Sequence, residues 1–424
     1  MSHKKTLISN FLSLSGVQLA SYVLPLINVP YLVRVLGPEK FGLIAFAQAF
    51  IGYFLLITDY GFNLTATREI SINRNNEQKI SEIFSSVMII KMGLLFLSFL
   101  TLCLFVFTID KFKIEWKVYL ASFGVVAGNA LFPTWFFQGM EKMKQVALLN
   151  ILSKAIFTGS IFVFIRTQSD YIYLPLINSA GFVAAGLLSL WMIFRQFGVS
   201  LKVPTLGSIK FQLNEGWHIF LSQIAINLYT VSNTFILGLF TNNTIVGYYS
   251  AGEKIVRAVL GTLGPLSQTI YPHISKLSSE SRESALVFIR KVVKLVVVPS
   301  FLVSLVLLIF APLISDIVLG KQFKESIHVI QILSFLPFLI SLSNLFGIQT
   351  MLNFGLKKTF TKILATGSFV NIFLGLILVV PLQHIGIAIS ALASEMCVSV
   401  YMFIILEQHN LNVLQIKALF GTTK

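Results

Sequence analysis

Charged residues are scarce in this chain, and acidic ones are the scarcest. Of its 424 residues only 12% are charged, and 17 Asp and Glu stand against 32 Lys and Arg. Water-soluble domains average about 25% charged residues, so the composition argues against a soluble fold. It also argues against a nucleic acid partner, because such a partner requires a soluble basic face with polar surroundings.

Metal-binding and nucleotide-binding signatures are also missing. The sequence has only 2 cysteines, Cys103 and Cys397, and both lie inside apolar runs, so neither a disulfide framework nor a zinc site is expected. Its 6 histidines are scattered without metal-ligand spacing. No G-x-x-x-x-G-K-S/T phosphate loop occurs, so the chain does not hydrolyse ATP through that motif. We therefore expect no metal, no cofactor and no enzymatic activity.

Long apolar runs make up most of the chain, since 55% of its residues are hydrophobic and 39 are Phe. A membrane-spanning helix needs about 20 mainly apolar residues. Twelve segments qualify, at 11–33, 41–61, 83–107, 118–138, 146–165, 172–194, 216–239, 246–270, 292–314, 326–351, 360–380 and 386–406. The eighth is the weakest, because Glu253, Lys254 and Arg257 interrupt it. The expected fold class is an all-α integral membrane protein with about 12 transmembrane helices.

The short loops between these segments differ in their content of Lys and Arg. If the N-terminus lies inside, the inner segments hold 19 of these residues and the outer loops hold 8. Cytoplasmic loops carry an excess of Lys and Arg. We therefore expect a multi-pass protein with both termini in the cytoplasm.

A hydrophilic stretch in the middle of the chain suggests two halves. Residues 195–215 contain Gly198, Pro204 and Gly207 and form the longest internal hydrophilic segment. We predict an N-terminal six-helix lobe (1–194), a cytoplasmic linker (195–215) and a C-terminal six-helix lobe with a short cytoplasmic tail (216–424). A shift of 205 residues superposes similar positions of the two halves: Gln18 on Gln223, Ala20 on Ala225, Asn28 on Asn233, Leu32 on Leu237 and Gly42 on Gly247. Parallel repeats of this kind place a central substrate cavity between two lobes.

Ionisable residues inside the apolar segments are the candidate functional residues. Such a group near the bilayer centre costs on the order of 3 kcal/mol, so it normally faces water or a partner. We predict a cationic, substrate-binding lumen and a set of acids that serve ion coupling or structure. The cations are Lys91, Lys154, Lys254 and Arg257, and the acids are Glu253, Asp59 and Glu395. Lys294 is expected to snorkel to the interface.

Several of these residues leave alternatives open. Glu253 and Arg257 are four residues apart, so they either form a structural ion pair on one helix face or take part in substrate or ion coupling. Asp59 either orders the loop that holds Arg68 or acts in coupling, and Glu395 either hydrogen-bonds a neighbouring helix or has a functional role. A lumen with excess positive charge suits an anionic substrate such as a diphosphate.

Four stretches of sequence carry a family resemblance. They are YLVRVLGPEKFG from Tyr31 to Gly42, DYGF from Asp59 followed by Arg68 and Glu69, PTWFFQGMEKM from Pro133 to Met143, and VGYYSAGEK from Val246 to Lys254. The first two resemble the opening of polysaccharide transporters in the multidrug/oligosaccharidyl-lipid/polysaccharide flippase superfamily. The third resembles the cytoplasmic end of their fourth helix, and the last resembles the start of their eighth. The resemblance points to the O-antigen flippase (Wzx-type) branch.

The resemblance implies two six-helix lobes arranged as a V, with a cavity lined mainly by the first, second, seventh and eighth helices. Lys254 and Arg257 would face that cavity. The implied function is translocation of an undecaprenyl-diphosphate-linked oligosaccharide, the O-antigen repeat unit of lipopolysaccharide, from the cytoplasmic to the periplasmic leaflet of a bacterial inner membrane. Alternating access with proton or sodium coupling is the implied mechanism. Implied partners are the lipid-linked glycan, membrane lipid, a polysaccharide polymerase and a chain-length regulator.

Two other functions are compatible with a polytopic membrane protein. A multidrug or organic-cation antiporter of the same superfamily would require carboxylates to dominate the lumen, whereas basic residues dominate here. A membrane-embedded glycosyltransferase or polymerase would require paired catalytic acids or large catalytic loops. The predicted outer loops are short, so we expect the enzyme least.

Overall fold

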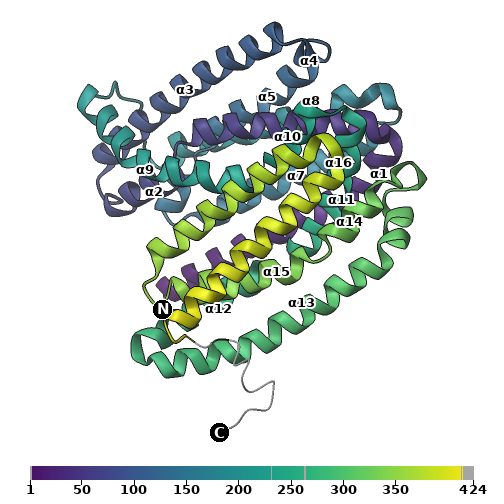
Figure 1. Cartoon of the computed structure of the whole chain (residues 1–424). Coiled ribbons are helices and arrows are strands. Elements are labelled where there is room, and N and C mark those ends of the chain that lie inside the picture. Colours follow the sequence, from purple (N-terminus) through teal and green to yellow (C-terminus); the bar gives the residue numbers. More distant parts are fainter. Residues whose placement is uncertain (1, 231, 262–263, 412, 414–424) are drawn as a thin grey trace. The chain divides into compact units, whose positions relative to one another are not determined.

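The computed structural model describes residues 2–230, 232–261, 264–411 and 413. This part of the chain is almost entirely helical and contains no β-strand. The chain divides into two compact units, Met1–Asn227 and Leu228–Lys424. Figure 1 draws the first unit in purple to teal and the second in green to yellow.

The first unit consists of long helices joined by short connections. Its elements are α1 (Ser2–Asp59), α2 (Phe62–Ile72), α3 (Glu77–Thr108), α4 (Asp110–Lys113), α5 (Trp116–Leu131), α6 (Thr134–Gly139), α7 (Met143–Phe164), the 3-10 turn η1 (Gln168–Ile172), α8 (Tyr173–Gln196) and most of α9 (Leu206–Thr230). The side chain of Asn76 caps α3 by accepting a hydrogen bond from the Lys79 amide over 3.0 Å. Such a cap satisfies one of the amide groups that a helix leaves unpaired at its start.

The break in α1 lies between the first two predicted segments. Gly37 has φ 69° and ψ 175°, values outside the helical region. Glycine adopts a positive φ without the steric cost that a side chain would bring. The helical stretches on either side of Gly37 contain the predicted segment 11–33 and all but the last two residues of the segment 41–61.

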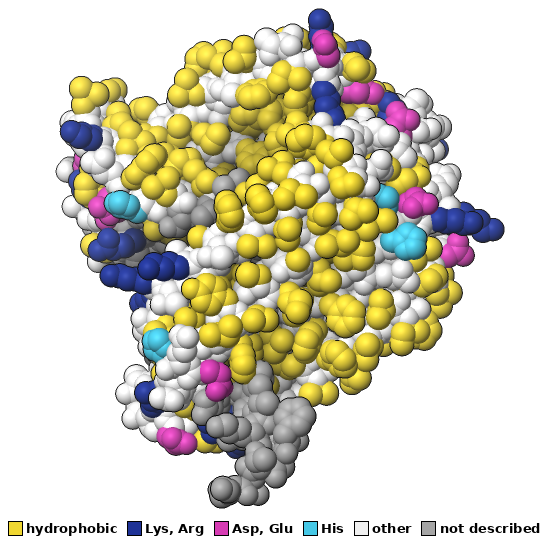
Figure 2. All heavy atoms as spheres, viewed as in Figure 1, with side chains coloured by type: hydrophobic (Ala, Val, Ile, Leu, Met, Phe, Trp, Pro, Cys, Tyr) yellow, Lys and Arg dark blue, Asp and Glu magenta, His cyan; other side chains and the backbone are white. Residues whose placement is uncertain are grey.

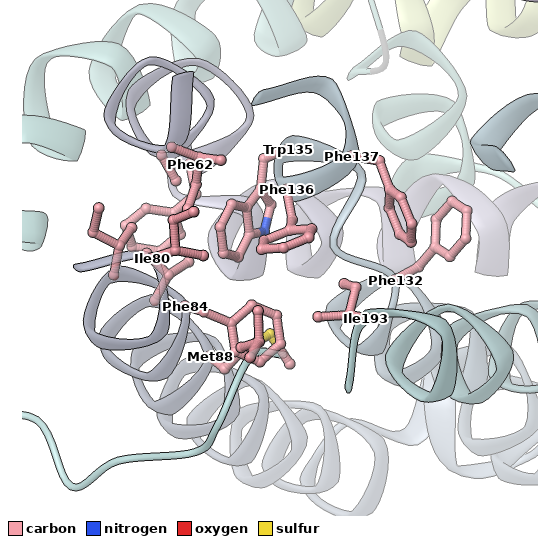
Figure 3. Close-up of a cluster of buried hydrophobic side chains, with 14 of the residues drawn as sticks. Phe62, Ile80, Phe84, Met88, Phe132, Trp135, Phe136, Phe137 and Ile193 are labelled. Carbon is pink, nitrogen blue, oxygen red and sulfur yellow. The ribbon is translucent and has the colours of Figure 1, made fainter. Parts of the chain in front are cut away.

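Aromatic residues form the core of the first unit beside α2, α3 and α6. Trp135, Phe136 and Phe137 of α6 are fully buried, and they pack among Phe62 of α2 and Phe84 of α3. Figure 3 shows these rings together with Ile80, Met88, Phe132 and Ile193. The segment PTWFFQG therefore serves packing, because its large side chains point into this core.

The predicted linker is packed against the first unit. The backbone amides of Ser200 and Lys202 donate to the hydroxyl groups of Ser81 (3.2 Å) and Ser85 (2.9 Å) on α3. The ring of Phe220 on α9 stacks on Tyr60 with 4.8 Å between centroids. The boundary between the compact units accordingly falls within α9, after Asn227.

The second unit repeats the pattern of long helices with local breaks. Its elements are α10 (Ser232–Phe240), α11 (Asn243–Gly261), α12 (Gly264–Glu280), α13 (Arg282–Val318), the 3-10 turn η2 (Lys321–Phe323), α14 (Ser326–Leu333), α15 (Leu336–Ser343), the π-helix η3 (Asn344–Met351) and α16 (Lys357–Gln408). Gln383 interrupts α16 with φ 48°, two residues after Pro381. This break lies between the predicted segments 360–380 and 386–406.

Apolar side chains cover the outer surfaces of the long helices. On α13 and α16 the exposed residues include Leu295, Ile309, Ile317, Phe369 and Val380. Figure 2 shows a broad hydrophobic surface over these two helices, with charged side chains near their ends. Such a surface is stable in lipid but would drive aggregation in water.

Eight stretches of the described residues are long and apolar enough to cross a membrane. The first of them (Ile27–Ile72) contains the break at Gly37, and the last (Lys357–Gln408) contains the break at Gln383. The chain is therefore an all-helical, multi-pass membrane protein, as predicted. The described residues of the predicted segments are helical apart from short breaks at 60–61, 132–133, 165 and 334–335. Residues 231, 262 and 263 of these segments lie outside the described residues.

Candidate functional site

Lys91 and Asp59 form an ion pair inside the first unit. Lys91 lies on α3 and is 1% exposed, and its Nζ is 3.8 Å from Oδ1 of Asp59 at the end of α1. The amide of Asn63 on α2 donates to Oδ2 of Asp59 over 2.9 Å. A buried ammonium needs such a partner because desolvation penalises an isolated charge. Lys91 is thus enclosed by protein, and its predicted role as a substrate ligand stays a prediction.

Arg68 lies on helix α2 rather than in a loop, and among the described residues Asp59 forms its ion pair with Lys91 and not with Arg68. The Arg68 guanidinium lies 4.0 Å from Glu215 of α9 instead. Asp59 reaches the same segment through Asn63, one turn before Arg68. The carboxylate therefore links α1 to α2 and α3.

Lys154 lines a cavity within the first unit. This cavity of about 30 Å³, the Lys154 cavity, lies between α7 and α8. Asn150 and Ser153 of α7 and Asn178 of α8 line it as well, and Phe132 and Phe182 contribute apolar wall. The spacing of Asn150 and Lys154 places both on one face of α7. One cation and several amide or hydroxyl groups thus share a small site among apolar helices.

Glu253 and Arg257 pair on α11, as their spacing of four residues predicted. Nη2 and Nε of Arg257 lie 2.8 Å and 2.9 Å from Oε1 of Glu253. The two side chains differ in exposure, at 52% for Arg257 and 14% for Glu253. Because half of the Arg257 side chain is exposed, Arg257 can hold its carboxylate partner and still contact a ligand.

A cavity of about 90 Å³ surrounds this pair, and we call it the polar cavity. Asn233 of α10, Tyr249 of α11 and Asn371 of α16 line it together with Glu253 and Arg257. The Asn371 amide donates to Oδ1 of Asn233 over 3.0 Å. Amide, phenol and guanidinium groups are suited to sugar hydroxyl and phosphate oxygens.

Sequence reasoning missed Asn233, Tyr249 and Asn371 as site residues. Tyr249 precedes Glu253 by four residues, so the helical period that linked Glu253 to Arg257 extends to it. Asn371 is an amide in the middle of an otherwise apolar segment. Each of these signals was present in the sequence, but each is weak without the fold.

Glu395 also lines the polar cavity. It lies on α16, is 5% exposed, and accepts a hydrogen bond from the Ser343 hydroxyl at 2.5 Å. Ser343 ends α15 immediately before the π-helix. The expected hydrogen bond between Glu395 and a neighbouring helix is therefore present, and a role in ion coupling stays a prediction.

The predicted residues are divided between the two units. Lys91, Asp59 and Lys154 belong to the first, whereas Glu253, Lys254, Arg257 and Glu395 belong to the second. Lys254 is partly buried on α11 and does not line the cavities described above. Among the described residues no group of three or more His, Cys, Asp or Glu side chains is arranged to hold a metal ion.

The fold matches solved membrane transporters of one superfamily. An inward-facing multidrug resistance MATE family transporter of the MOP superfamily superposes with a TM-score of 0.73 at 14% identity, over 96% of this chain and 99% of that one. The lipid II flippase MurJ in an inward closed conformation gives a TM-score of 0.70 at 13% identity, over 99% and 93%. These likenesses show that the chain has the fold of these two membrane transporters.

Sequence comparison then defines the family. Residues 7–278 match the model of the polysaccharide biosynthesis protein family. A protein of Escherichia coli (strain K12) named "Putative O-antigen transporter" is 34% identical over 97% of this chain and 99% of its own length. A "Probable low-salt glycan biosynthesis flippase" of Haloferax volcanii is 24% identical over 88% of this chain and 77% of its own. The chain belongs to the polysaccharide biosynthesis protein family, and the two relatives are named as a transporter and a flippase rather than as enzymes.

Proposed function

We propose that this protein is a flippase for a glycan linked to a polyprenyl diphosphate. The specific cargo proposed is an undecaprenyl-diphosphate-linked O-antigen repeat unit, and the route runs from the cytoplasmic to the periplasmic leaflet of a bacterial inner membrane. Membership of the polysaccharide biosynthesis protein family and the names of the relatives support this class of cargo.

The half-exposed side chain of Arg257 beside the polar cavity is the observation that carries the proposal. It lies on a helix of a membrane protein, where a charged group is tolerated only beside water or a partner. Glu253 supplies one partner, and Arg257 also lines the polar cavity, where a ligand can contact it. Planar Arg donors match the oxygens of phosphate groups. A diphosphate is therefore the ligand group that we assign to Arg257.

Lys154 extends the proposal to the first unit. Its cavity holds an ammonium beside the side chains of Asn150, Ser153 and Asn178. Each unit thus has its own cation that can bind an anionic head group during alternating access. Outward movement of the negatively charged group is assisted by a negative-inside membrane potential, by about 2.3 kcal/mol per charge per 100 mV. Proton or sodium coupling stays a prediction.

An organic-cation antiporter is the second candidate, because Glu253 and Glu395 both line the polar cavity. Glu253 forms an ion pair with Arg257, and Glu395 accepts a hydrogen bond from the Ser343 hydroxyl. Both carboxylates are thus engaged within the protein. This arrangement suits an anionic ligand better than a cationic one.

Complementation of a bacterial strain that lacks its own O-antigen flippase tests the proposed function. We expect the chain to restore surface O-polysaccharide when the strain makes a matching repeat unit, and to leave resistance to cationic drugs unchanged. Strains with different repeat units should be compared, since a mismatch of sugars would otherwise hide the activity. Failure in all of them with the protein present in the membrane, or a gain of drug resistance, would contradict the proposal.

A further inference from the structure

The C-terminal unit contains a second cavity, which the proposed binding of the diphosphate does not use. It measures about 220 Å³, and we call it the apolar cavity. Its walls come from α11, α12, α13, α15 and η3, and they include Leu260, Ile270, Val292, Val296 and Leu345. Aliphatic side chains from five elements thus enclose most of the space.

The polar groups at the edge of the apolar cavity are engaged with one another. The Ser267 hydroxyl on α12 donates to Oδ1 of Asn344 over 2.7 Å. The Gln349 amide donates to the Ser267 hydroxyl over 2.9 Å and to the Ser267 carbonyl over 3.0 Å. These bonds join α12 to the π-helix, although the buried Oε1 of Gln349 has no hydrogen-bond partner among the described residues. Aliphatic side chains form the larger part of the lining, so the cavity favours a mainly apolar occupant.

The π-helix shapes this wall. Its hydrogen bonds run from one residue to the fifth before it, as in the bond from the Leu352 amide to the Gly347 carbonyl over 3.1 Å. Asn344 and Gln349 therefore lie one turn apart on the same side, facing α12. π-helical turns are rare and occur frequently at functional sites, because they are less favourable than α-helix.

The apolar cavity adjoins the polar cavity. Leu260 and Ile340 line both of them. Leu260 lies three residues after Arg257 on α11, about 4.5 Å further along the helix axis. A ligand with an anionic head at Arg257 could therefore place its adjoining apolar part beside Leu260.

The size of the apolar cavity suits a short stretch of hydrocarbon. An apolar cavity of about 150 Å³ binds benzene, which has six carbon atoms. The 220 Å³ available here can accept one or two five-carbon isoprene units. Each buried methylene group would add about 0.8 kcal/mol to binding.

We propose that the apolar cavity binds the isoprene units next to the diphosphate of the cargo lipid. This inference rests on the proposed function, because it requires a polyprenyl diphosphate as the ligand. It adds a chain-recognition site within the second unit to the head-group site at Arg257. The flippase would thereby select isoprenoid diphosphates over phospholipids, whose glycerol and ester groups cannot occupy an apolar cavity without losing hydrogen bonds to water.

Photolabelling of the full-length protein tests this site. The probe is farnesyl diphosphate with a diazirine on the isoprene unit nearest the diphosphate, and the labelled peptides are identified by mass spectrometry. We expect labels within residues 260–296 or 340–349, and competition by unlabelled farnesyl diphosphate but not by the same concentration of a phosphatidylglycerol. Labels elsewhere, or equal competition by both lipids, would overturn the proposal.

Substitutions on α13 supply the matched controls. Val296→Phe is expected to lower labelling about tenfold, the effect of removing roughly two buried methylene groups of ligand, and Val296→Leu should lower it less. Val298→Phe introduces the same ring two residues away, where the side chain is exposed at the apolar surface, and should label like the wild type. Equal labelling of Val296→Phe and Val298→Phe, with both proteins folded by thermal melting, would overturn the site.

The complementation assay separates the two proposals. Restored O-polysaccharide without specific labelling of the apolar cavity would reject the chain site and leave the flippase function in place. Specific labelling without restored O-polysaccharide in any strain would reject the flippase function, while the isoprenoid diphosphate site would stand.

Discussion

Replacement of Arg257 by alanine is expected to reduce export of the lipid-linked glycan by about 10- to 100-fold while the protein stays in the membrane. A hydrogen bond to a charged group contributes about 1.5–3 kcal/mol, and each 1.4 kcal/mol corresponds to about tenfold in binding. The measurement is the amount of surface O-polysaccharide in the complemented strain, normalised to the protein level. Lys154→Ala should reduce export less, because its cavity is smaller than the polar cavity at Arg257.

Lys294→Ala is the matched control for the Arg257 variant. Lys294 lies on α13 with its side chain exposed, so loss of this charge should leave export near the wild-type level. Glu253→Gln distinguishes ligand binding by Arg257 from a structural role of the Glu253–Arg257 ion pair. This variant removes the carboxylate of the pair but keeps the guanidinium of Arg257. Export should fall less in Glu253→Gln than in Arg257→Ala if Arg257 binds the diphosphate. Equal losses in the two single variants, with no further loss in the double variant, would indicate a purely structural pair.

Replacement of Gly128 by valine is expected to prevent the first unit from folding. Gly128 on α5 faces α8, and a Cβ atom at this position would collide with the backbone of Phe182 and Val183. The contact is reciprocal, because a Cβ on Gly186 of α8 would lie 2.8 Å from the Gly128 carbonyl oxygen. Small residues allow membrane helices to approach this closely. Overpacking costs about 1–3 kcal/mol where side chains can move, and backbone cannot move without separating the helices.

The yield and melting temperature of the purified Gly128→Val protein check this expectation. Gly93→Val on α3 is the control, because a Cβ there would meet nothing within 4 Å. The control should behave like the wild type, whereas Gly128→Val should give little folded protein. A melting temperature for Gly128→Val within about 2 °C of the wild type, less than the effect of 1 kcal/mol in a unit of this size, would show that α5 and α8 do not pack as described.

The membrane-spanning segments could be predicted because the thickness of the bilayer fixes their length and composition. The breaks in α1 and α16 were placed correctly, since Arg34 to Lys40 and Pro381 to Ile385 interrupt the apolar runs there. The π-helix was not predicted. Its bonds to α12 join Gln349 to Ser267, 82 residues earlier, and such a contact leaves no local signal in the sequence.

The ionisable residues of the site could be found from the sequence, but most of their partners could not. Glu253 and Arg257 share one helix, so their spacing was sufficient to predict the pair. Lys91 and Asp59 lie on different helices, and their contact depends on how α1 packs against α3. The same holds for Glu395 and Ser343. The hydropathy of a segment indicates that a charged residue lies in the membrane. The partner of that residue depends on how the helices pack against one another.

We propose that Arg257 and Lys154 are tolerated in the membrane because they line cavities that water can enter. The most direct test is the reaction of a charged, membrane-impermeant thiol reagent with Arg257→Cys and Lys154→Cys, after Cys103 and Cys397 have been replaced by serine. We predict rapid modification at both positions, slowed by farnesyl diphosphate, and very slow modification of Val298→Cys at the apolar surface. Rates at positions 257 and 154 as slow as that at 298 would contradict the account.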